Sequence, residues 1–432
     1  MFIFTGRNYI MEKVKEFDLI IIGAGAAGTL AAIAAGRKGL KTLLVEKENC
    51  AGGMVSSGLL SIWGPFDDGE KRIIKGLPEE ILQRLVDRKF AENRKTGFIA
   101  VDPEGVKLVL DEFITEAGVE VLYHTILAGA ETESNLIEEI TLATKSGKSR
   151  VKAQIYIDAS GDGDLAAQSG VSFVTGKPET GWVQPMSSIC RLGGIDENLY
   201  HWEGNFRYRN EIKQAIENGE ITFDADGIGC ATYVPGLKGV IAVNMSHVSD
   251  LDPLSAQDVS KAEIIGRKQC REILLFFRKY VTGCAEAFLI DTGMQIGIRE
   301  SRRIQGKYML TAEDILAGRE FPDNIAVNAY HIDIHIPSKE KTSDTIRKPK
   351  KYYGIPFRSL LPLEVNNLIV TGRCISCTHE ALGSVRIMPC CMAMGQAAGT
   401  AAFLAIQNHT IPGNIDISQL QDMLFRDKAC LG

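Results

Sequence analysis

Three glycines and one glutamate near the N-terminus have the types and spacing of a dinucleotide-binding site. Gly23, Gly25 and Gly28 form a GxGxxG pattern, and Glu46 follows eighteen residues after the last of them. The first glycine permits a tight turn, the second lets the backbone approach a pyrophosphate, and the third lets a helix pack closely on a strand. The glutamate can accept hydrogen bonds from an adenosine ribose. The pattern therefore predicts a site for a dinucleotide such as NAD or FAD.

The segments around these glycines have the patterns of a strand, a helix and a second strand. Asp18–Ile22 predicts a buried strand, Ala26–Lys38 a helix of small and apolar residues, and Leu43–Val45 a strand that ends beside Glu46. The pyrophosphate is expected at the N-terminus of this helix, where free N–H groups and the helix dipole favour anions. Leu19–Gly36 carries no charged residue, but the glycine turn interrupts it, so we interpret it as strand plus helix rather than as a membrane span.

Two segments with histidines could transfer protons. His379 lies in a predicted loop late in the chain, and His331, Asp333 and His335 alternate with isoleucines in the predicted strand Ile325–Ile336. Alternation places these three polar residues on one face of the strand. Such a face could form the polar wall of a substrate pocket or hold a metal ion. The sequence offers no obvious further metal ligand, which favours the polar wall.

Three arginines form a third candidate site. Arg299, Arg302 and Arg303 fall on one face if their segment is a helix. They could then clamp a carboxylate or phosphate of a substrate. The alternative is a charged helix whose arginines pair with Glu300 and with water.

Composition and charge limit the class of protein. The chain has 432 residues, is 45% hydrophobic and 24% charged, and carries a net charge of −6. The length suits two domains, and the charge gives no reason to expect binding to nucleic acid or to an anionic membrane. Ten scattered cysteines do not make a disulfide framework. No export signal is visible from either Met1 or Met11, so a cytoplasmic protein is expected.

The rest of the chain suggests one nucleotide-binding domain interrupted by a second domain. We expect the first part of the nucleotide domain over residues 12–170, a substrate domain over 171–348, and a return to the nucleotide domain over 349–432. The predicted elements are helices Pro78–Asn93, Pro103–Ala117, Ser255–Tyr280 and Pro389–Gln407, strands Val119–Tyr123, Gly239–Met245 and Leu368–Thr371, a β-meander over Ala128–Ile157, and a mobile loop over Ser338–Lys351.

Four separated blocks together resemble a known family. They are the glycine fingerprint, Ile157–Gly163, Gly297–Ile304 and Asn367–Gly399. The chain is similar over these blocks to the bacterial FAD-dependent oxidoreductase family, which has a glutathione-reductase-like FAD-binding domain. The resemblance implies an α/β fold: a Rossmann domain made of a parallel sheet plus a β-meander, with an inserted α+β substrate domain. It also implies FAD as the cofactor.

The resemblance implies roles for particular residues. It places the N-terminus of helix Pro389–Gln407 at the pyrimidine end of the flavin, where a helix dipole stabilises the reduced form. It makes His379 the first candidate base, with His335 and Arg299 as further catalytic candidates. The residues expected to contact FAD are Gly23, Gly25, Ala26, Ala27, Gly28, Glu46, Lys47, Gly52, Gly53, Met54, Ser160, Gly161, Asp162, Gly372, Arg373, Gln396, Ala397 and Ala398.

The expected activity is hydride transfer between a small organic substrate and the flavin. No second GxGxxG is present, so electrons are expected to pass to a separate acceptor, and a homo-oligomer is possible. A first alternative is a thiol or disulfide oxidoreductase that uses Cys374 and Cys377, with Cys390 and Cys391 nearby in sequence. Packed thiols are the favoured interpretation of these cysteines, since their spacing suits neither zinc nor an iron–sulfur cluster. A second alternative is a flavin-binding electron carrier without catalytic activity.

Overall fold

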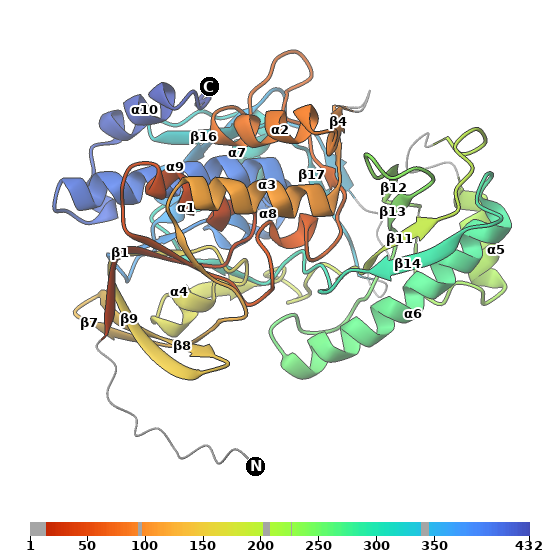
Figure 1. Ribbon diagram of the computed structural model, residues 1–432, viewed down its shortest axis with the longest axis horizontal. Coiled ribbons are helices and arrows are strands. Elements are labelled where there is room, and N and C mark those ends of the chain that lie inside the picture. The colour runs from red at the N-terminus through yellow and green to blue at the C-terminus, as the bar shows by residue number, and fades with distance from the viewer. Residues whose placement is uncertain (1–13, 94–96, 202–207, 226, 338–344) are drawn as a thin grey trace, which may run out of the picture.

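The chain folds into two lobes, each built around a hydrophobic cluster of its own (Figure 1). A computed structural model describes residues 14–93, 97–201, 208–225, 227–337 and 345–432. The first and larger lobe contains both the start and the end of the chain. The second lobe comprises the elements between Ile189 and Thr292.

A seven-stranded sheet forms the centre of the first lobe. Its parallel part consists of β6 (Glu120–Leu122), β2 (Thr42–Val45), β1 (Lys15–Ile22), β9 (Gly147–Asp158) and β20 (Leu368–Val370). β7 (Ile126–Glu133) and β8 (Leu136–Thr144) complete it as an antiparallel meander with β9. This sheet therefore contains the expected meander and the strands expected at Asp18–Ile22, Leu43–Val45, Val119–Tyr123 and Leu368–Thr371, and the fold is α/β with a parallel sheet.

The parallel strands all end at the same edge of this sheet. Ile22 pairs with Val45 on one side and with Asp158 on the other, and Asp158 pairs with Val370. The residues that follow these strands are therefore neighbours, although they are far apart in sequence. Ligands of open α/β sheets bind at this edge.

Two helices cover one face of the sheet with their backbones in close contact. α1 (Ala26–Gly36) packs against α9 (Met388–Gln407). A Cβ at Gly395 would lie 2.1 Å from the carbonyl oxygen of Ala27, and one at Gly399 would lie 2.2 Å from that of Ala31. Among the described helices, α9 has the length and apolarity of a membrane span, but 83% of its most apolar window is buried in the protein.

The close contact makes Gly395 a sensitive position for stability. Gly395→Ala should lower the free energy of unfolding by about 3 kcal/mol, since the methyl group would force the two helices apart. Gly129→Ala in β7 is the control, because the nearest atom to its Cβ is a Thr141 carbon at 3.8 Å. Urea unfolding of both variants tests this, and equal loss in the two would contradict it.

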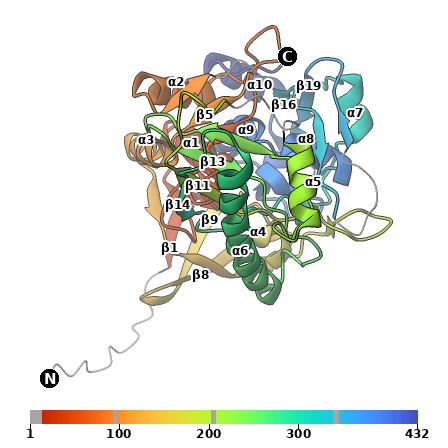
Figure 2. The ribbon, with the colours of Figure 1, turned by 90° about the vertical axis from the view of Figure 1, so that its right-hand side faces the viewer.

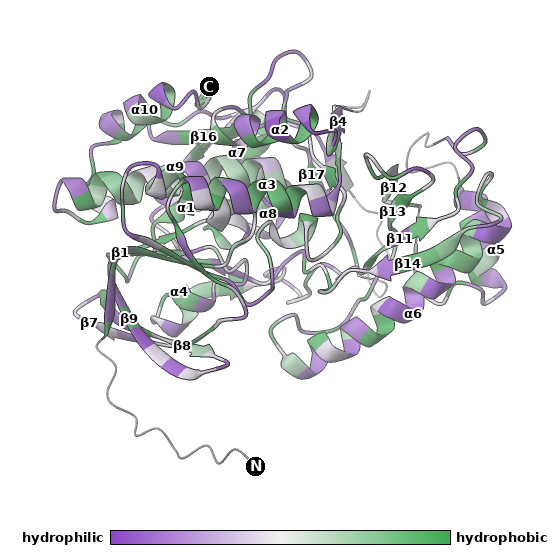
Figure 3. Ribbon diagram, viewed as in Figure 1, coloured by the Kyte–Doolittle hydropathy of each residue, from purple (hydrophilic) through white to green (hydrophobic). Residues whose placement is uncertain are grey.

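The second lobe is a small antiparallel sheet covered by helices. Its strand order is β12 (Cys230–Tyr233), β13 (Ile241–Asn244), β11 (Ile189–Gly193), β14 (Phe288–Thr292). α5 (Arg209–Glu217) and α6 (Ala256–Tyr280) lie on its outer side (Figure 2). α6 alternates between hydrophilic and hydrophobic residues along its length (Figure 3), as expected for a helix with one buried face.

Shorter elements connect the lobes and cover the sheet. They are α2 (Leu77–Asp87), α3 (Pro103–Glu116), α4 (Asp164–Gln168), α7 (Ala312–Ala317), α8 (His379–Val385) and α10 (Ile417–Arg426), and the strands β3 (Ile62–Trp63), β4 (Ala91–Asn93), β5 (Ile99–Val101), β10 (Phe173–Thr175), β15 (Arg302–Ile304), β16 (Asn324–Asn328), β17 (Ile332–Ile334), β18 (Thr345–Arg347) and β19 (Tyr353–Pro356).

Two predicted elements are wrong in part. The helix predicted over Pro78–Asn93 ends at Asp87, because Lys89 adopts a left-handed φ of 62° and the chain turns into β4. Ile325–Ile336 holds two short strands, β16 and β17, rather than one.

The segment that contains Arg299, Arg302 and Arg303 is not a helix. Arg302–Ile304 is β15, which pairs with Phe173–Thr175. Arg299, Arg302 and Arg303 therefore do not share a helical face, because tertiary strand pairing overrides local helix propensity.

Of the loop expected over Ser338–Lys351, residues 338–344 lie outside the described part of the chain. The domain limits at residues 170 and 348 stay a prediction, although Leu310 to Ile334 pack in the cluster of the first lobe.

Candidate functional site

The fingerprint glycines have the local geometry that their spacing predicts. Gly23 adopts a left-handed φ of 96°, and a Cβ at Gly28 would lie 1.8 Å from the carbonyl oxygen of Gly23. A Cβ at Gly25 would meet no protein atom within 4 Å. The turn is therefore closed at the first and third glycines and open at the second, where a pyrophosphate is expected.

The N-terminus of α1 faces this open position, and its own first turn supplies no negative charge to the positive end of the helix dipole. Its N-cap, Gly25, makes no side-chain cap, and the first turn contains no acidic residue. Glu46 lies beside it, where its Oε2 accepts a hydrogen bond from the Ala24 N–H at 2.6 Å. The Gly52 N–H donates to the Ala24 carbonyl at 2.8 Å, which holds the loop after β2 along the turn. These groups fit the adenosine and pyrophosphate half of FAD.

A partly buried ion pair lies after the ends of β9 and β20. Arg373 donates to Asp162 at 2.7 Å and to the Ser301 hydroxyl at 2.9 Å, and that hydroxyl donates to Asp162 at 2.7 Å. Burial opposes ionisation, but the charges of Arg373 and Lys47 and the Ser301 hydrogen bond hold the pKa of Asp162 below its ordinary value. The structure therefore brings together predicted residues from three distant blocks.

Asp158, at the end of β9, is a fully buried acid that supports this edge. It accepts hydrogen bonds from the Ser160 N–H at 3.0 Å, the Ser160 hydroxyl at 2.7 Å and the Ala166 N–H at 2.8 Å. Burial raises its pKa to about 6 despite these bonds. The folded protein thus binds the proton more tightly than the unfolded chain, so this contribution to stability is lost as the pH rises through about 6.

The effect of Asp158 can be isolated with Asp158→Asn. The stability of the wild type relative to the variant should fall by about 3 kcal/mol between about pH 4 and pH 7, since two pKa units are involved. Urea unfolding at both pH values measures this difference. A difference that stays constant with pH would contradict a raised pKa.

A second helix N-terminus marks the other end of the site. α9 also lacks a side-chain cap and has no acid in its first turn. Just before it, Arg386 donates to the backbone oxygens of Arg299 at 3.3 Å and of Asp333 at 3.0 Å. Arg299 itself donates to the Pro185 carbonyl oxygen at 2.6 Å and to the Ser187 hydroxyl at 2.6 Å. Arg386 therefore connects the start of α9 to the Arg299 segment and to β17, and the charges of both arginines act on His335.

The polar face predicted on the histidine strand exists. Ile332 and Ile334 are buried, whereas the side chains of Asp333 and His335 remain 22% and 25% exposed. His335 Nε2 lies 3.5 Å from Asp333 Oδ2. Burial and the positive charge of Arg299 lower the pKa of His335, so the imidazole is neutral at pH 7. A neutral imidazole beside a carboxylate can accept a proton.

His379 lies deeper than predicted. It is the first residue of α8 rather than part of a loop, and only 1% of its side chain is exposed. Its Nδ1 lies 2.8 Å from Glu300 Oε1, and Glu300 also pairs with the buried Arg303. Its role in catalysis stays a prediction, and its burial favours a role in positioning Glu300.

Other predicted contacts have protein partners of their own. Gln396 Oε1 accepts a hydrogen bond from the Leu77 N–H at 2.9 Å, and Ala397 and Ala398 are fully buried. Met54 lies against Gly297, where its Cε would be 3.0 Å from an added Cβ. Contact of these residues with FAD stays a prediction.

Sequence reasoning missed two residues that join the site. Gln184 donates from its backbone N–H to Glu300 at 3.2 Å and accepts from the His335 N–H at 3.2 Å, so it connects the two histidine sites. His247, from the second lobe, has its ring 6.0 Å from that of His335. No motif marks either residue, since both arrive through tertiary contacts from segments without a regular pattern.

The four late cysteines are buried thiols. Burial raises the pKa of Cys377 and of Cys391 to about 12, and it raises those of Cys374 and Cys390 as well. All ten cysteines are free. Within the described ranges no group of three or more His, Cys, Asp or Glu side chains could hold a metal ion. These thiols are poor nucleophiles, because the thiolate is the reactive form.

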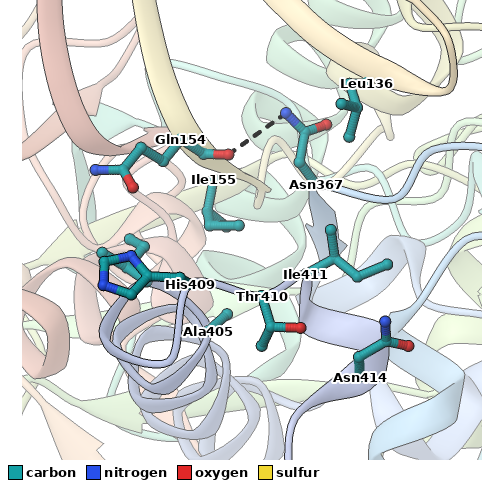
Figure 4. Close-up of a pocket in the computed structure, with 10 residues that line it drawn as sticks. Leu136, Gln154, Ile155, Asn367, Ala405, His409, Thr410, Ile411 and Asn414 are labelled. Atoms are coloured by element: carbon teal, nitrogen blue, oxygen red, sulfur yellow. Dashed lines mark hydrogen bonds between the residues drawn. The ribbon is translucent and has the colours of Figure 1, made fainter.

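A separate cavity of about 460 Å³ lies between β9 and the end of α9 (Figure 4). Its lining consists of Leu136, Gln154, Ile155, Asn367, Ala405, Ile406, His409, Thr410, Ile411 and Asn414. None of these is a predicted site residue. Asn367 bonds both the N–H and the carbonyl oxygen of Ile137, at 2.9 and 3.0 Å, so it has a structural role there.

Comparison with known proteins gives one match over most of the chain and several partial ones. The FAD dependent oxidoreductase family matches residues 18–424. A 3-oxosteroid 1-dehydrogenase from Mycobacterium tuberculosis is 33% identical over 101 residues, which are 22% of this chain and 18% of that protein. A digeranylgeranylglycerophospholipid reductase from Methanosarcina mazei is 27% identical over 170 residues, which are 34% of this chain and 38% of that protein. The matched region thus spans less than two fifths of either relative.

Solved structures with a similar fold include a monooxygenase. The p-nitrophenol 4-monooxygenase of Pseudomonas putida aligns with a TM-score of 0.52 at 12% identity, over 95% of this chain and 84% of that chain. The family match, together with a fingerprint turn that is open at Gly25, identifies this chain as an enzyme that uses FAD and belongs to the FAD dependent oxidoreductase family.

Proposed function

We propose that this protein oxidises a small organic substrate by hydride transfer to FAD and passes the electrons to a separate acceptor. The observation that carries the proposal is the Asp333–His335 pair, which stays partly exposed beside Arg299 and Arg386 at the N-terminus of α9. The open turn at Gly25 supports a cofactor that extends from there to α9.

In this proposal the two halves of the cofactor lie at the N-termini of α1 and α9, along the carboxyl edge of the sheet. The N-terminus of α1 and Glu46 bind the pyrophosphate and ribose, and Asp162 and Arg373 lie along the middle. The N-terminus of α9 faces the flavin ring, where its dipole favours the negative charge of the reduced form. Bound FAD supplies the acceptor of a hydride, which carries two electrons from the substrate.

The side chains of the polar wall, Asp333 and His335, accept and stabilise the proton. His335 takes the proton that the substrate loses, since its imidazole is neutral and partly accessible. Asp333 stabilises the imidazolium that results. Asp333 can do so because, although burial opposes it, the His335 hydrogen bond and the charge of Arg386 hold its pKa below its ordinary value. Gln184 holds the backbone of His335 in place.

The thiol alternative predicts loss of activity on removal of Cys374 and Cys377. We expect the double variant Cys374→Ala/Cys377→Ala to keep its rate of flavin reduction within about threefold, because buried protonated thiols do not react. Rapid-mixing absorbance measures this rate. A loss of two orders of magnitude in a variant that still folds and holds FAD would favour the thiol mechanism.

As part of this proposal, the protein has a glutathione-reductase-like FAD domain, and residues 171–348 form an inserted substrate domain. Oxygen or another carrier is the electron acceptor. The protein acts in the cytoplasm, binds neither nucleic acid nor a membrane, and can form a homo-oligomer.

Anaerobic screening of metabolites tests the proposal. The flavin-loaded protein is mixed with fractions of a metabolite pool, and the flavin absorption is followed. A dehydrogenase or oxidase loses its absorption with at least one component and regains it on addition of an acceptor. An electron carrier without a substrate of its own would stay oxidised with every fraction.

A further inference from the structure

A short basic segment, residues 345–351, lies beside the polar wall of the proposed site. It begins with β18, which pairs antiparallel with β17 so that Arg347 lies opposite Ile332 and Ile346 opposite Asp333. The segment contains four Lys or Arg residues and no Asp or Glu. Its positive charge is therefore placed next to the strand that carries Asp333.

Three of these four positive charges have no acidic partner in the part of the chain that the structure describes. Lys351 donates to Glu320 at 2.8 Å, whereas no ion pair there involves the other three, Arg347, Lys348 and Lys350. All three are exposed. The longer stretch of sequence from 338 to 351 contains six basic and two acidic residues, so it is positive as a whole.

The charge of this segment also acts on the neighbouring strand. Burial and the positive charge of Lys348 lower the pKa of His331, against the opposing charge of Asp333. His331 directly precedes β17, the strand of the polar wall. The positive field of the basic segment therefore extends to the wall beside which the flavin is proposed to bind.

The sign of this local charge is opposite to that of the whole protein. The chain carries a net charge of −6, so an evenly charged surface would repel anions. Exposed charges act over about 10 Å at 0.1 M salt, so a local patch can determine which partners approach one part of the surface. A partner with an acidic surface would be attracted to residues 345–351, and a basic one would be repelled.

Exposed lysines of this kind suit a protein partner better than a small anion. A single ion is held weakly at such side chains, because water and salt screen the charges and ordering a long side chain costs entropy. A protein that presents several opposite charges at once gains in association rate from all of them. The proposed function includes a separate electron acceptor, which must approach the flavin from outside.

We propose that this acceptor is a one-electron carrier protein with an acidic surface, and that residues 345–351 dock it beside the polar wall. Two carrier molecules each take one of the two electrons of the hydride, and its proton is released to water. This inference rests on the proposed function, because it assigns the class of the acceptor. Lysines on an edge strand also discourage pairing with other chains, but that role alone predicts no effect on electron transfer.

Plastocyanin and cytochrome c are the probes. Both are one-electron carriers, but plastocyanin has an acidic surface and cytochrome c a basic one. The FAD-loaded protein is reduced by light with EDTA in the absence of oxygen, and its reoxidation is followed by rapid mixing. At about 10 mM salt we expect plastocyanin to react at least about tenfold faster than cytochrome c, and the difference to disappear at about 0.5 M salt. A faster reaction of cytochrome c at low salt, which the net charge of −6 alone would give, would overturn the proposal.

The double variant Lys348→Glu/Lys350→Glu tests the segment itself. At low salt it should slow plastocyanin at least about tenfold and accelerate cytochrome c, since two exposed charges change sign. Lys145→Glu/Lys148→Glu is the matched control, because it makes the same change of charge at two exposed positions around the turn between β8 and β9, at the start of β9 and not at its carboxyl end. Its rates should stay within about twofold of the wild type. An unchanged plastocyanin rate in Lys348→Glu/Lys350→Glu would overturn the docking role.

A vesicle assay separates a carrier protein from a membrane as the partner of this segment. Suppose that phosphatidylserine vesicles bind the wild type but not Lys348→Glu/Lys350→Glu, while the plastocyanin rates of the two are equal. The segment would then bind anionic lipid, and the proposal would fail. These outcomes are separate from those of the proposed function, because light reduces the flavin without a substrate. A metabolite screen that finds no substrate would contradict the proposed function and leave the reoxidation result as it is.

Discussion

Gly25→Val should leave the protein folded but unable to retain FAD. No protein atom lies within 4 Å of a Cβ at this position, and the residue has a φ of −68°, which any amino acid adopts. The added side chain therefore occupies the space expected for the pyrophosphate and not a space needed by the fold. We expect FAD affinity to fall at least about a hundredfold. Stability should fall by no more than about 1 kcal/mol, the cost of a poorer helix N-cap.

Two glycines serve as controls for this result. Gly28→Ala should abolish folding instead, because its methyl group would lie 1.8 Å from the Gly23 carbonyl oxygen. Gly129→Val in β7 adds the same side chain far from the fingerprint and should keep full FAD content. Flavin absorbance after reconstitution and urea unfolding separate the two kinds of loss. Normal FAD content in Gly25→Val would contradict the placement of the pyrophosphate.

His335→Asn should lower the rate of substrate-dependent flavin reduction by about 10²-fold to 10⁴-fold, the usual contribution of a general base. The amide keeps the polarity of the site but accepts no proton at neutral pH. FAD content should not change, because His335 lies on the wall of the proposed substrate site. Rapid mixing under anaerobic conditions, with the metabolite found by screening, measures the rate.

Matched variants distinguish His335 from His379. His409→Asn, just beyond the C-terminal end of α9, should react as fast as the wild type. His379→Asn removes a buried positioning residue, so it should reduce the rate without removing the pH dependence that comes from the base. A full rate in His335→Asn, together with a flat pH profile in His379→Asn, would make His379 the base.

The part of the site that the sequence predicted depends on local stereochemistry. Only glycine tolerates the φ of 96° at position 23 and the close contact at position 28, so the spacing of Gly23 and Gly28 determines the turn. Alternation of Ile332 and Ile334 with polar residues likewise defines the face that carries Asp333 and His335. These predictions needed only neighbours in sequence.

The part that could not be predicted depends on contacts between distant segments. Arg302–Ile304 forms a strand only because Phe173–Thr175 pairs with it. His247 reaches His335 only because the second lobe lies against the first, and its own segment has no periodic pattern. The burial of His379 similarly follows from its contact with Trp182, whose ring lies 4.7 Å away.

A crystal structure of the FAD-loaded protein tests the account most directly. We expect the pyrophosphate at Gly25 and the N-terminus of α1, and the flavin ring between the N-terminus of α9 and the side chain of His335. A flavin ring that lies elsewhere, for example in the cavity beside Gln154 and His409, would contradict it.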